Sequence, residues 1–190
     1  MGRTSDAADR LLAAACALMH DRGYSGIGVA EICAHADVRK GSFYHFFPSK
    51  EELTIAVVDR HWETQRPEWI RAREGDGPAL NRLAVLLDGQ AAAQRADKAA
   101  TGTVRGCLLA NLGLELSTQE ARVQRRIREV FDEQTAIVAA ILTQAGVPAP
   151  DETARAVLAQ LEGAVLFAKL TNDPASLDDL WSQTRRLLGV

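Results

Sequence analysis

The chain has 190 residues, a length that suits one domain or two small ones. Hydrophobic types form 47% of it, with 32 alanines against only ten aromatic residues, which is typical of a helical protein because alanine is the best helix former. The net charge of −3 excludes a uniformly basic nucleic-acid-binding coat, and no apolar run approaches the ~20 residues that cross a bilayer. We therefore expect a cytoplasmic protein that does not enter a membrane.

The first quarter of the chain predicts three helices and the start of a fourth. Apolar residues at helical spacing from Leu11 to Met19 predict a first helix, which Gly23 stops. Two short helices follow, around residues 29–36 and 40–46. Ser49 and Glu52 then form a capping box that opens a long helix reaching about residue 73.

The rest of the chain shows the same helical period. Residues 96–103 are small and polar and are expected to form a loop, Ser117 and Glu120 form a second capping box, and Asp173 caps the last helix. The five further predicted helices cover approximately residues 79–95, 105–116, 123–142, 154–168 and 173–188. The predicted fold class is therefore all-α with nine helices.

Two short helices separated by about three residues have the geometry of a helix-turn-helix. The second is seven residues long, or ~10 Å, and can enter a DNA major groove ~12 Å wide. Phe43 and Phe47 are spaced i, i+4 and are expected in the core, so that Tyr44 and His45 face outward. On pattern alone, a small helical domain whose aromatic residues serve only its core is an equally good interpretation.

The residues from Val29 to Leu53 resemble the DNA-binding domain of the TetR/AcrR family of transcriptional regulators. The resemblance implies a helix-turn-helix domain over residues 1–47. An effector-binding and dimerisation domain would follow over residues 48–190, with the helix at about 49–73 connecting the two. It also implies a homodimer that binds a palindromic operator and is released by a small-molecule effector. The residues expected at the DNA are Gly28, Arg39, Lys40, Gly41, Ser42, Tyr44, His45 and Lys50, the last as a phosphate contact.

The charge of the predicted DNA-binding region is less basic than is usual for a DNA-binding domain. Residues 1–62 hold seven Lys or Arg and eight Asp or Glu, a net charge of −1 (7 − 8). The positive charge near the second short helix is therefore local, and a small number of phosphate contacts predicts a shallow salt dependence.

A second segment, Gly106-Cys107-Leu108 with Asn111 and Glu115 after it, resembles a branch of the family that includes electrophile-responsive repressors. In that branch the cysteine can be the sensing residue and a lysine on the eighth helix can lie near it, which here points to Lys169. The residues allow this chemistry, because a helix N-terminus and the neighbouring Arg105 both favour a thiolate. The alternative is that Cys107 only packs in the core, as unpaired cysteines often do.

Helical phase suggests two further sets of residues. An effector pocket would be lined by Trp62, Trp69, Leu86, Phe131 and Phe167, with Asn111 as a polar anchor, although each is also a good core residue. The last two helices would supply a dimer surface made of Leu161, Ala164, Val165, Ala168, Leu177, Trp181 and Leu188.

The sequence favours no enzyme class. The four histidines have no i, i+3 or i, i+4 pair, and the HExxH, GxSxG and glycine-rich phosphate-loop motifs are missing, so no catalytic residue, metal or cofactor is expected. The prediction is a DNA-binding transcriptional regulator, most simply a repressor, whose partners are operator DNA, a small-molecule effector and a second copy of the chain. The alternative is a helical ligand-binding or protein-interaction module without specific DNA binding.

Overall fold

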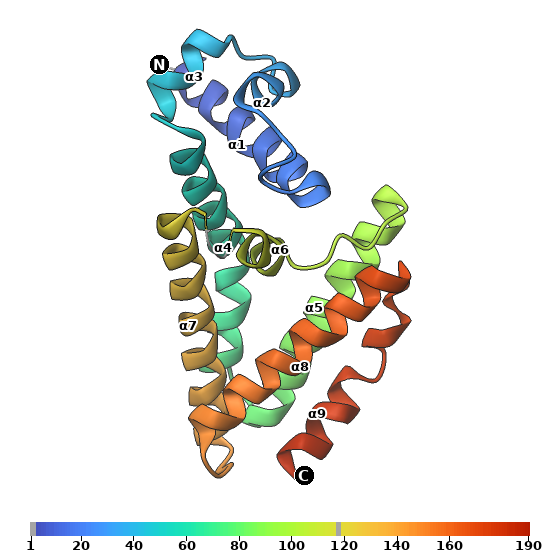
Figure 1. The fold of residues 1–190 in the computed structure, drawn as a ribbon. Helices are drawn as coiled ribbons and strands as arrows, with labels where there is room; N and C mark the ends of the chain where they lie inside the picture. Colours follow the sequence, from blue (N-terminus) through green and yellow to red (C-terminus); the bar gives the residue numbers. More distant parts are fainter. Residues whose placement is uncertain (1–2, 117–118) are drawn as a thin grey trace. The chain divides into compact units, whose positions relative to one another are not determined.

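The computed structural model describes residues 3–116 and 119–190, and every long regular element within them is an α-helix (Figure 1). This confirms the predicted all-α class with nine α-helices in the described ranges; a single 3₁₀ turn, η1, precedes the last of them. None of these helices combines the length and apolar character needed to cross a membrane. The elements are α1 (Arg3–Arg22), α2 (Val29–His35), α3 (Lys40–Phe46), α4 (Lys50–Glu74), α5 (Ala79–Thr101), α6 (Leu108–Glu115), α7 (Ala121–Gln144), α8 (Pro150–Thr171), η1 (Pro174–Leu177) and α9 (Leu180–Leu188).

The helices form two compact units. The first contains Met1–Thr64 and Leu108–Glu129, and the second contains Gln65–Cys107 and Val130–Val190. The first unit extends beyond the expected domain of residues 1–47, because it also takes in α6 and the N-terminal parts of α4 and α7.

In the first unit, α1 packs against α2, α3 and α6. The core holds Leu11, Ala15 and Met19 of α1 together with Ile32 and Phe43, all buried. Cys33 is 3% exposed and packs as a small hydrophobic residue. Gly23 has φ +77° and its N–H donates to the Met19 carbonyl at 2.9 Å, so the predicted end of the first helix is confirmed.

In the second unit, α8 lies beside α5, η1 and α9 (Figure 1). Buried leucines and valines from these four elements contribute to its core, together with buried apolar residues of α7 such as Ile141 and Leu142. The part of α4 after residue 64 is tied to the rest of the unit by polar contacts. Arg66 donates to Glu133 at 2.6 Å, and Arg82 donates to the Arg73 carbonyl at 2.8 Å.

Three predicted boundaries were wrong. Residues 96–101 continue α5 instead of forming a loop, because alanine, lysine and aspartate do not stop a helix; Gly102, at φ +78°, does. The sixth helix begins at Leu108 and not at residue 105. The last predicted helix is divided: Asp173 caps the N–H of Ala175 at 3.0 Å, but this opens the 3₁₀ turn η1, and α9 starts only at Leu180.

The two predicted capping boxes have different outcomes. The N–H of Glu52 donates to the Ser49 hydroxyl at 3.1 Å, which confirms this half of the first box. The second box begins at Ser117, which lies outside the described residues.

Candidate functional site

The predicted recognition helix α3 is anchored by one buried side chain and exposes three polar ones. Phe43 is fully buried, and its ring meets that of Tyr44 edge-on with 5.1 Å between centroids. Tyr44 is 54% exposed, and Lys40 and His45 are also exposed. The outward face of α3 therefore presents a phenol, an ammonium and an imidazole, all groups that can donate hydrogen bonds to phosphates or base edges.

The ends of the two short helices leave their backbone accessible. Gly28, the N-cap of α2, is exposed and extended, with no side chain to cap the helix. Asp37, in the turn between the helices, has φ +50°, a left-handed conformation that aspartate tolerates better than most residues. Arg39 is the N-cap of α3, and neither it nor Lys40 forms an ion pair with another residue of the described ranges. Two exposed cations thus stand at the start of α3, where Gly41 and the half-buried Ser42 follow them.

Lys50 lies in a different environment from Lys40. Its Nζ donates to the carbonyl oxygens of Tyr24 and Ile27, at 2.6 Å each, and lies 3.9 Å from the centroid of the Tyr24 ring. Burial lowers the pKa of Lys50, although the carboxylates of Glu115 and Glu120 oppose this effect. The phosphate contact expected of Lys50 remains a prediction, and the structure gives this ammonium two acceptors within the protein.

The same short segment has a partner that sequence reasoning missed. We call residues 23–28, between α1 and α2, the α1–α2 connection. Glu115, the last residue of α6, accepts hydrogen bonds from the backbone N–H groups of Tyr24 and Ser25, both at 2.7 Å. The Tyr24 hydroxyl donates to Glu120 at 2.6 Å. The sequence singles out Glu115 only as part of the Gly-Cys-Leu segment, and its partner lies 91 positions away in the chain.

In the second unit, Cys107 is half-buried directly before α6. It forms a hydrogen bond with Glu162 of α8, a residue that the sequence analysis did not identify. Burial raises the pKa of Glu162, and the hydrogen bond with Cys107 only partly offsets the increase. Lys169 lies on the same helix seven residues later, or ~10 Å along the axis.

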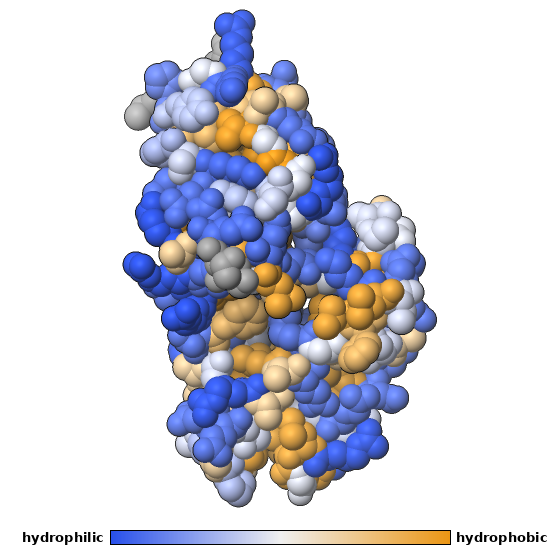
Figure 2. Space-filling model, viewed as in Figure 1, coloured by the Kyte–Doolittle hydropathy of each residue, from blue (hydrophilic) through white to orange (hydrophobic). Residues whose placement is uncertain are grey.

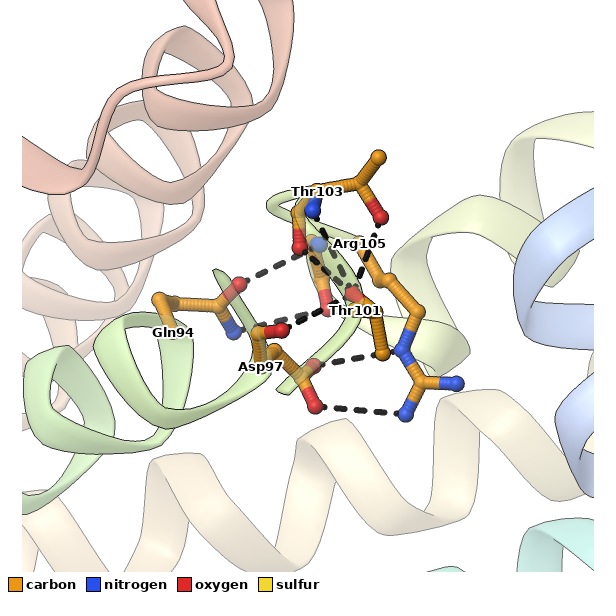
Figure 3. Close-up of polar contacts among 6 residues, drawn as sticks. Gln94, Asp97, Thr101, Thr103 and Arg105 are labelled. Carbon is orange, nitrogen blue, oxygen red and sulfur yellow. Dashed lines mark hydrogen bonds and ion pairs between the residues drawn. The ribbon is translucent and has the colours of Figure 1, made fainter. Parts of the chain in front are cut away.

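The segment before Cys107 is held on the end of α5 (Figure 3). The Arg105 guanidinium, expected to favour a thiolate at Cys107, forms an ion pair with Asp97 at 3.2 Å. Gln94 bonds both backbone groups of Gly106, accepting at 3.2 Å and donating at 3.4 Å. The backbone that presents Cys107 is therefore anchored at the two residues directly before it.

Asn172 anchors the same segment from the end of α8. Its side chain accepts from the Val104 N–H at 2.9 Å and donates to the Gly102 carbonyl at 3.2 Å. Its own carbonyl accepts from Lys98 of α5 at 2.9 Å.

The residues predicted to line an effector pocket belong to both units. Trp62 and Asn111 belong to the first unit, whereas Trp69, Phe131 and Phe167 belong to the second. Both tryptophans are 2% exposed and Phe131 is half-buried, but Phe167 is 62% exposed on the surface of α8. The effector pocket suggested by helical phase stays a prediction.

The second unit does contain a pocket of about 580 Å³ between the end of α4 and the start of α5. Of the residues predicted for an effector site, only Leu86 lines it. Two guanidinium groups, Arg71 and Arg82, and two carboxylates, Glu68 and Asp76, give it mixed charge. A volume of this size falls in the range of small-molecule sites.

The residues predicted for a dimer surface are mostly buried within the chain's own second unit. Five of them are less than 10% exposed, and Ala164 and Trp181 are half-buried; the five are Leu161, Val165, Ala168, Leu177 and Leu188. The exposed apolar side chains of α8 are instead Leu166, Phe167 and Leu170, which are 46%, 62% and 70% exposed. Figure 2 shows hydrophobic side chains gathered on the surface of the second unit where α8 lies.

Comparison with known proteins gives consistent results over both halves of the chain. A family model described as bacterial regulatory proteins, tetR family, matches residues 11–57. A second, described as the C-terminal domain of LmrA/YxaF-like transcriptional regulators, matches residues 85–183.

Individual relatives cover most of the chain. The transcriptional repressor NemR of Escherichia coli is 31% identical over 141 residues, which are 74% of this chain and 67% of NemR. The transcriptional regulator AcuR of Cereibacter sphaeroides is 32% identical over 176 residues, or 87% of this chain and 76% of AcuR.

Solved structures share the fold. The reduced form of E. coli NemR aligns with a TM-score of 0.76 at 28% identity, over 95% of this chain and 96% of NemR. The regulatory protein TetR from Rhodobacter sphaeroides aligns with a TM-score of 0.82 at 28% identity, over 94% of this chain and 97% of the other.

Proposed function

Because the chain belongs to the TetR family of helix-turn-helix transcriptional regulators, we propose that it is a homodimeric repressor that binds a palindromic operator and is released by a small-molecule effector. The observation that carries the proposal is the outward face of α3, on which Lys40, Tyr44 and His45 are exposed above the buried Phe43. In a dimer, two such helices ~34 Å apart would contact successive major grooves on one side of the DNA.

The direct test is binding to the intergenic DNA upstream of the gene, measured by fluorescence anisotropy. The double variant Lys40→Ala/Tyr44→Ala should weaken specific binding by about 30-fold or more, since each base-edge contact contributes ~1–3 kcal/mol of discrimination. Arg125→Ala is the matched control, because it removes an exposed positive charge from α7 without touching α3. Unchanged operator affinity in the double variant would refute the assignment of Lys40 and Tyr44 to the operator. A wild-type chain that binds no operator would favour the alternative of a helical interaction module without specific DNA binding.

We assign the dimer surface to the exposed apolar side chains of α8, namely Leu166, Phe167 and Leu170. The residues predicted from helical phase are already buried in the second unit, so they contribute little new buried area on association. The three exposed residues are spaced to lie along one side of α8, as a helix that packs against a partner requires.

Cys107 supports a second, more specific proposal, in which the effector is an electrophile that forms a covalent bond with the thiol. The observation that favours it is the hydrogen bond between Cys107 and Glu162. An ionised Glu162 carboxylate can accept the thiol proton as the sulfur adds to an electron-poor alkene; the S–C bond forms, and the adjacent alkene carbon takes up a proton. Packing alone is the alternative role for this cysteine.

N-ethylmaleimide provides a defined probe for this proposal. It should release wild-type protein from the operator but should leave the Cys107→Ser variant bound, with Cys16→Ser as the control because Cys16 lies on α1. Equal release of wild type and Cys107→Ser would assign Cys107 to packing and leave the α4–α5 pocket as the place to search for a non-covalent effector.

A further inference from the structure

We propose that Glu115 is a positioning residue for operator binding: its carboxylate fixes the backbone of the α1–α2 connection and, through α2, the recognition helix α3. The inference rests on the proposed function, in which α3 contacts the operator. Glu115 is the last residue of the segment that begins with Gly106 and Cys107, and the role proposed for Cys107 does not explain why a glutamate stands there.

The first observation is the pair of hydrogen bonds from backbone to carboxylate. Each oxygen of Glu115 accepts one N–H, from Tyr24 at Oε2 and from Ser25 at Oε1, at 2.7 Å in both cases. Burial raises the pKa of Glu115, but the hydrogen bonds from Ser25 and Tyr24, together with the Lys50 ammonium, outweigh burial and hold the pKa below its ordinary value. The site therefore requires the ionised carboxylate.

The second observation is the close approach at Gly23. A β-carbon at this position would lie 2.6 Å from Oε2 of Glu115, closer than a β-carbon approaches another non-bonded heavy atom. Gly23 also has φ +77°, which favours glycine. Glycine thus allows α1 to end and the Glu115 carboxylate to reach the next two amides.

The third observation is that a residue of another helix binds the carbonyl groups of the α1–α2 connection. Lys50, at the start of α4, donates to the carbonyls of Tyr24 and Ile27 at 2.6 Å each. The connection is therefore held by an anion that binds its N–H groups and a cation that binds its C=O groups, so its course depends on both α6 and α4.

The α1–α2 connection leads directly into α2, which packs against α1 and α3. A shift of Glu115 therefore changes where α2 begins and where α3 is presented. The eight-residue helix α6 ends at Glu115 and starts immediately after Cys107. A single helix of ~12 Å thus joins the segment that carries the thiol to the residue that holds the connection.

The test compares Glu115→Gln with Leu114→Ala, a control at the neighbouring position of α6, where the side chain is 75% exposed. Glutamine keeps the size of the side chain but offers one acceptor oxygen in place of two and no charge. Operator Kd should rise by about tenfold, which corresponds to the loss of one charge-assisted hydrogen bond. The Kd for non-specific DNA should stay within about twofold, because phosphate charge interactions are unchanged. Hydrogen exchange at the Tyr24 and Ser25 amides should accelerate in Glu115→Gln and not in Leu114→Ala.

Several results would overturn the inference. Operator affinity equal to wild type, or an equal loss for specific and non-specific DNA, would show that Glu115 only supports general stability. A wild-type chain that binds no operator would refute the proposed function, whereas wild-type binding with an unaffected Glu115→Gln variant would refute only the positioning role of Glu115.

Gly23→Ala is an independent variant that displaces the carboxylate and leaves every hydrogen-bonding group in the chain. It should weaken operator binding as Glu115→Gln does. The variant that carries both changes should bind the operator as tightly as the single variant with the lower affinity, because both changes disrupt the same contact. Additive losses would show that the two residues act separately and would contradict the proposal.

Discussion

The substitution Lys50→Met distinguishes between two roles for this lysine. The sequence predicts a phosphate contact, whereas its position suggests that it stabilises the backbone of the α1–α2 connection. The ammonium donates to the carbonyls of Tyr24 and Ile27 at 2.6 Å each and lies 3.9 Å from the Tyr24 ring centroid. Hydrogen bonds from charged donors contribute ~1.5–3 kcal/mol each, and an exposed cation–π contact contributes ~0.5–1 kcal/mol. Burial lowers the pKa of Lys50, so desolvation offsets part of this gain, and methionine keeps the packing of the aliphatic stem. We expect Lys50→Met to destabilise the first unit by about 2–3 kcal/mol.

The assay combines stability and salt dependence. Hydrogen exchange of the α1 and α2 amides, measured at increasing urea concentration, reports the stability of the first unit. Operator binding measured from low to moderate salt gives the slope of log K against log salt, which changes by ~0.9 for each phosphate that the protein no longer neutralises. Lys40→Met is the matched control, because Lys40 is exposed at the start of α3; it should reduce the slope and leave unfolding unchanged.

The two roles give opposite results for Lys50→Met. A loss of stability with an unchanged salt slope supports the structural role. A slope reduced by ~0.9 with unchanged stability would refute the structural role and would assign Lys50 to a phosphate.

Two further predictions concern association and pH. Phe167→Glu should convert the proposed dimer to monomer in analytical ultracentrifugation, because it places a charge in the exposed apolar surface of α8, whereas Val85→Glu, at a 71% exposed position of α5, should not; a Phe167→Glu variant that remained dimeric would place the interface elsewhere. The pKa of Glu115 in the folded chain is below its ordinary value of 4.5, so its contribution to stability is complete above that value and disappears as the pH falls through the lower folded pKa. The difference in unfolding free energy between wild type and Glu115→Gln should therefore be greatest near neutral pH and vanish in acid, and a difference that persisted in acid would contradict a role for the ionised carboxylate.

Much of the helix-turn-helix could be predicted because it depends on local spacing. The i, i+4 pattern placed Phe43 in the core and Tyr44 on the surface, and the structure confirms both, although Phe47 is only half-buried. The end of α1 at Gly23 and the hydrogen bond from Glu52 to Ser49 also depend on neighbouring residues alone.

The contacts that hold the α1–α2 connection could not be predicted in this way. Glu115 and Tyr24 are 91 positions apart, and no periodicity in either segment indicates that they meet. The same limit applies to Glu162, whose contact with Cys107 joins α8 to the segment before α6. A glutamate within a helix is ordinarily a solvated residue, so composition gives no signal for either.

The apolar residues of α8 show a different limit. Helical phase identifies an apolar side of the helix but does not show which part of it the chain's own η1 and α9 cover. Val165 and Ala168 are covered, and Phe167, between them, is not. Only the tertiary structure shows which hydrophobic side chains are left for a partner.

Glu115 binds main-chain amides, and this has a consequence for how the chain tolerates mutation. Every residue except proline provides the N–H that the carboxylate needs at positions 24 and 25, so both backbone contacts persist when the side chain at position 25 changes. Only the additional hydrogen bond from the Ser25 side chain to Glu115 is then lost. In a saturation-mutagenesis library selected for repression, we therefore expect position 25 to admit many residues. Positions 23 and 115 should admit few, because only glycine leaves room for the carboxylate and only glutamate supplies it at this distance.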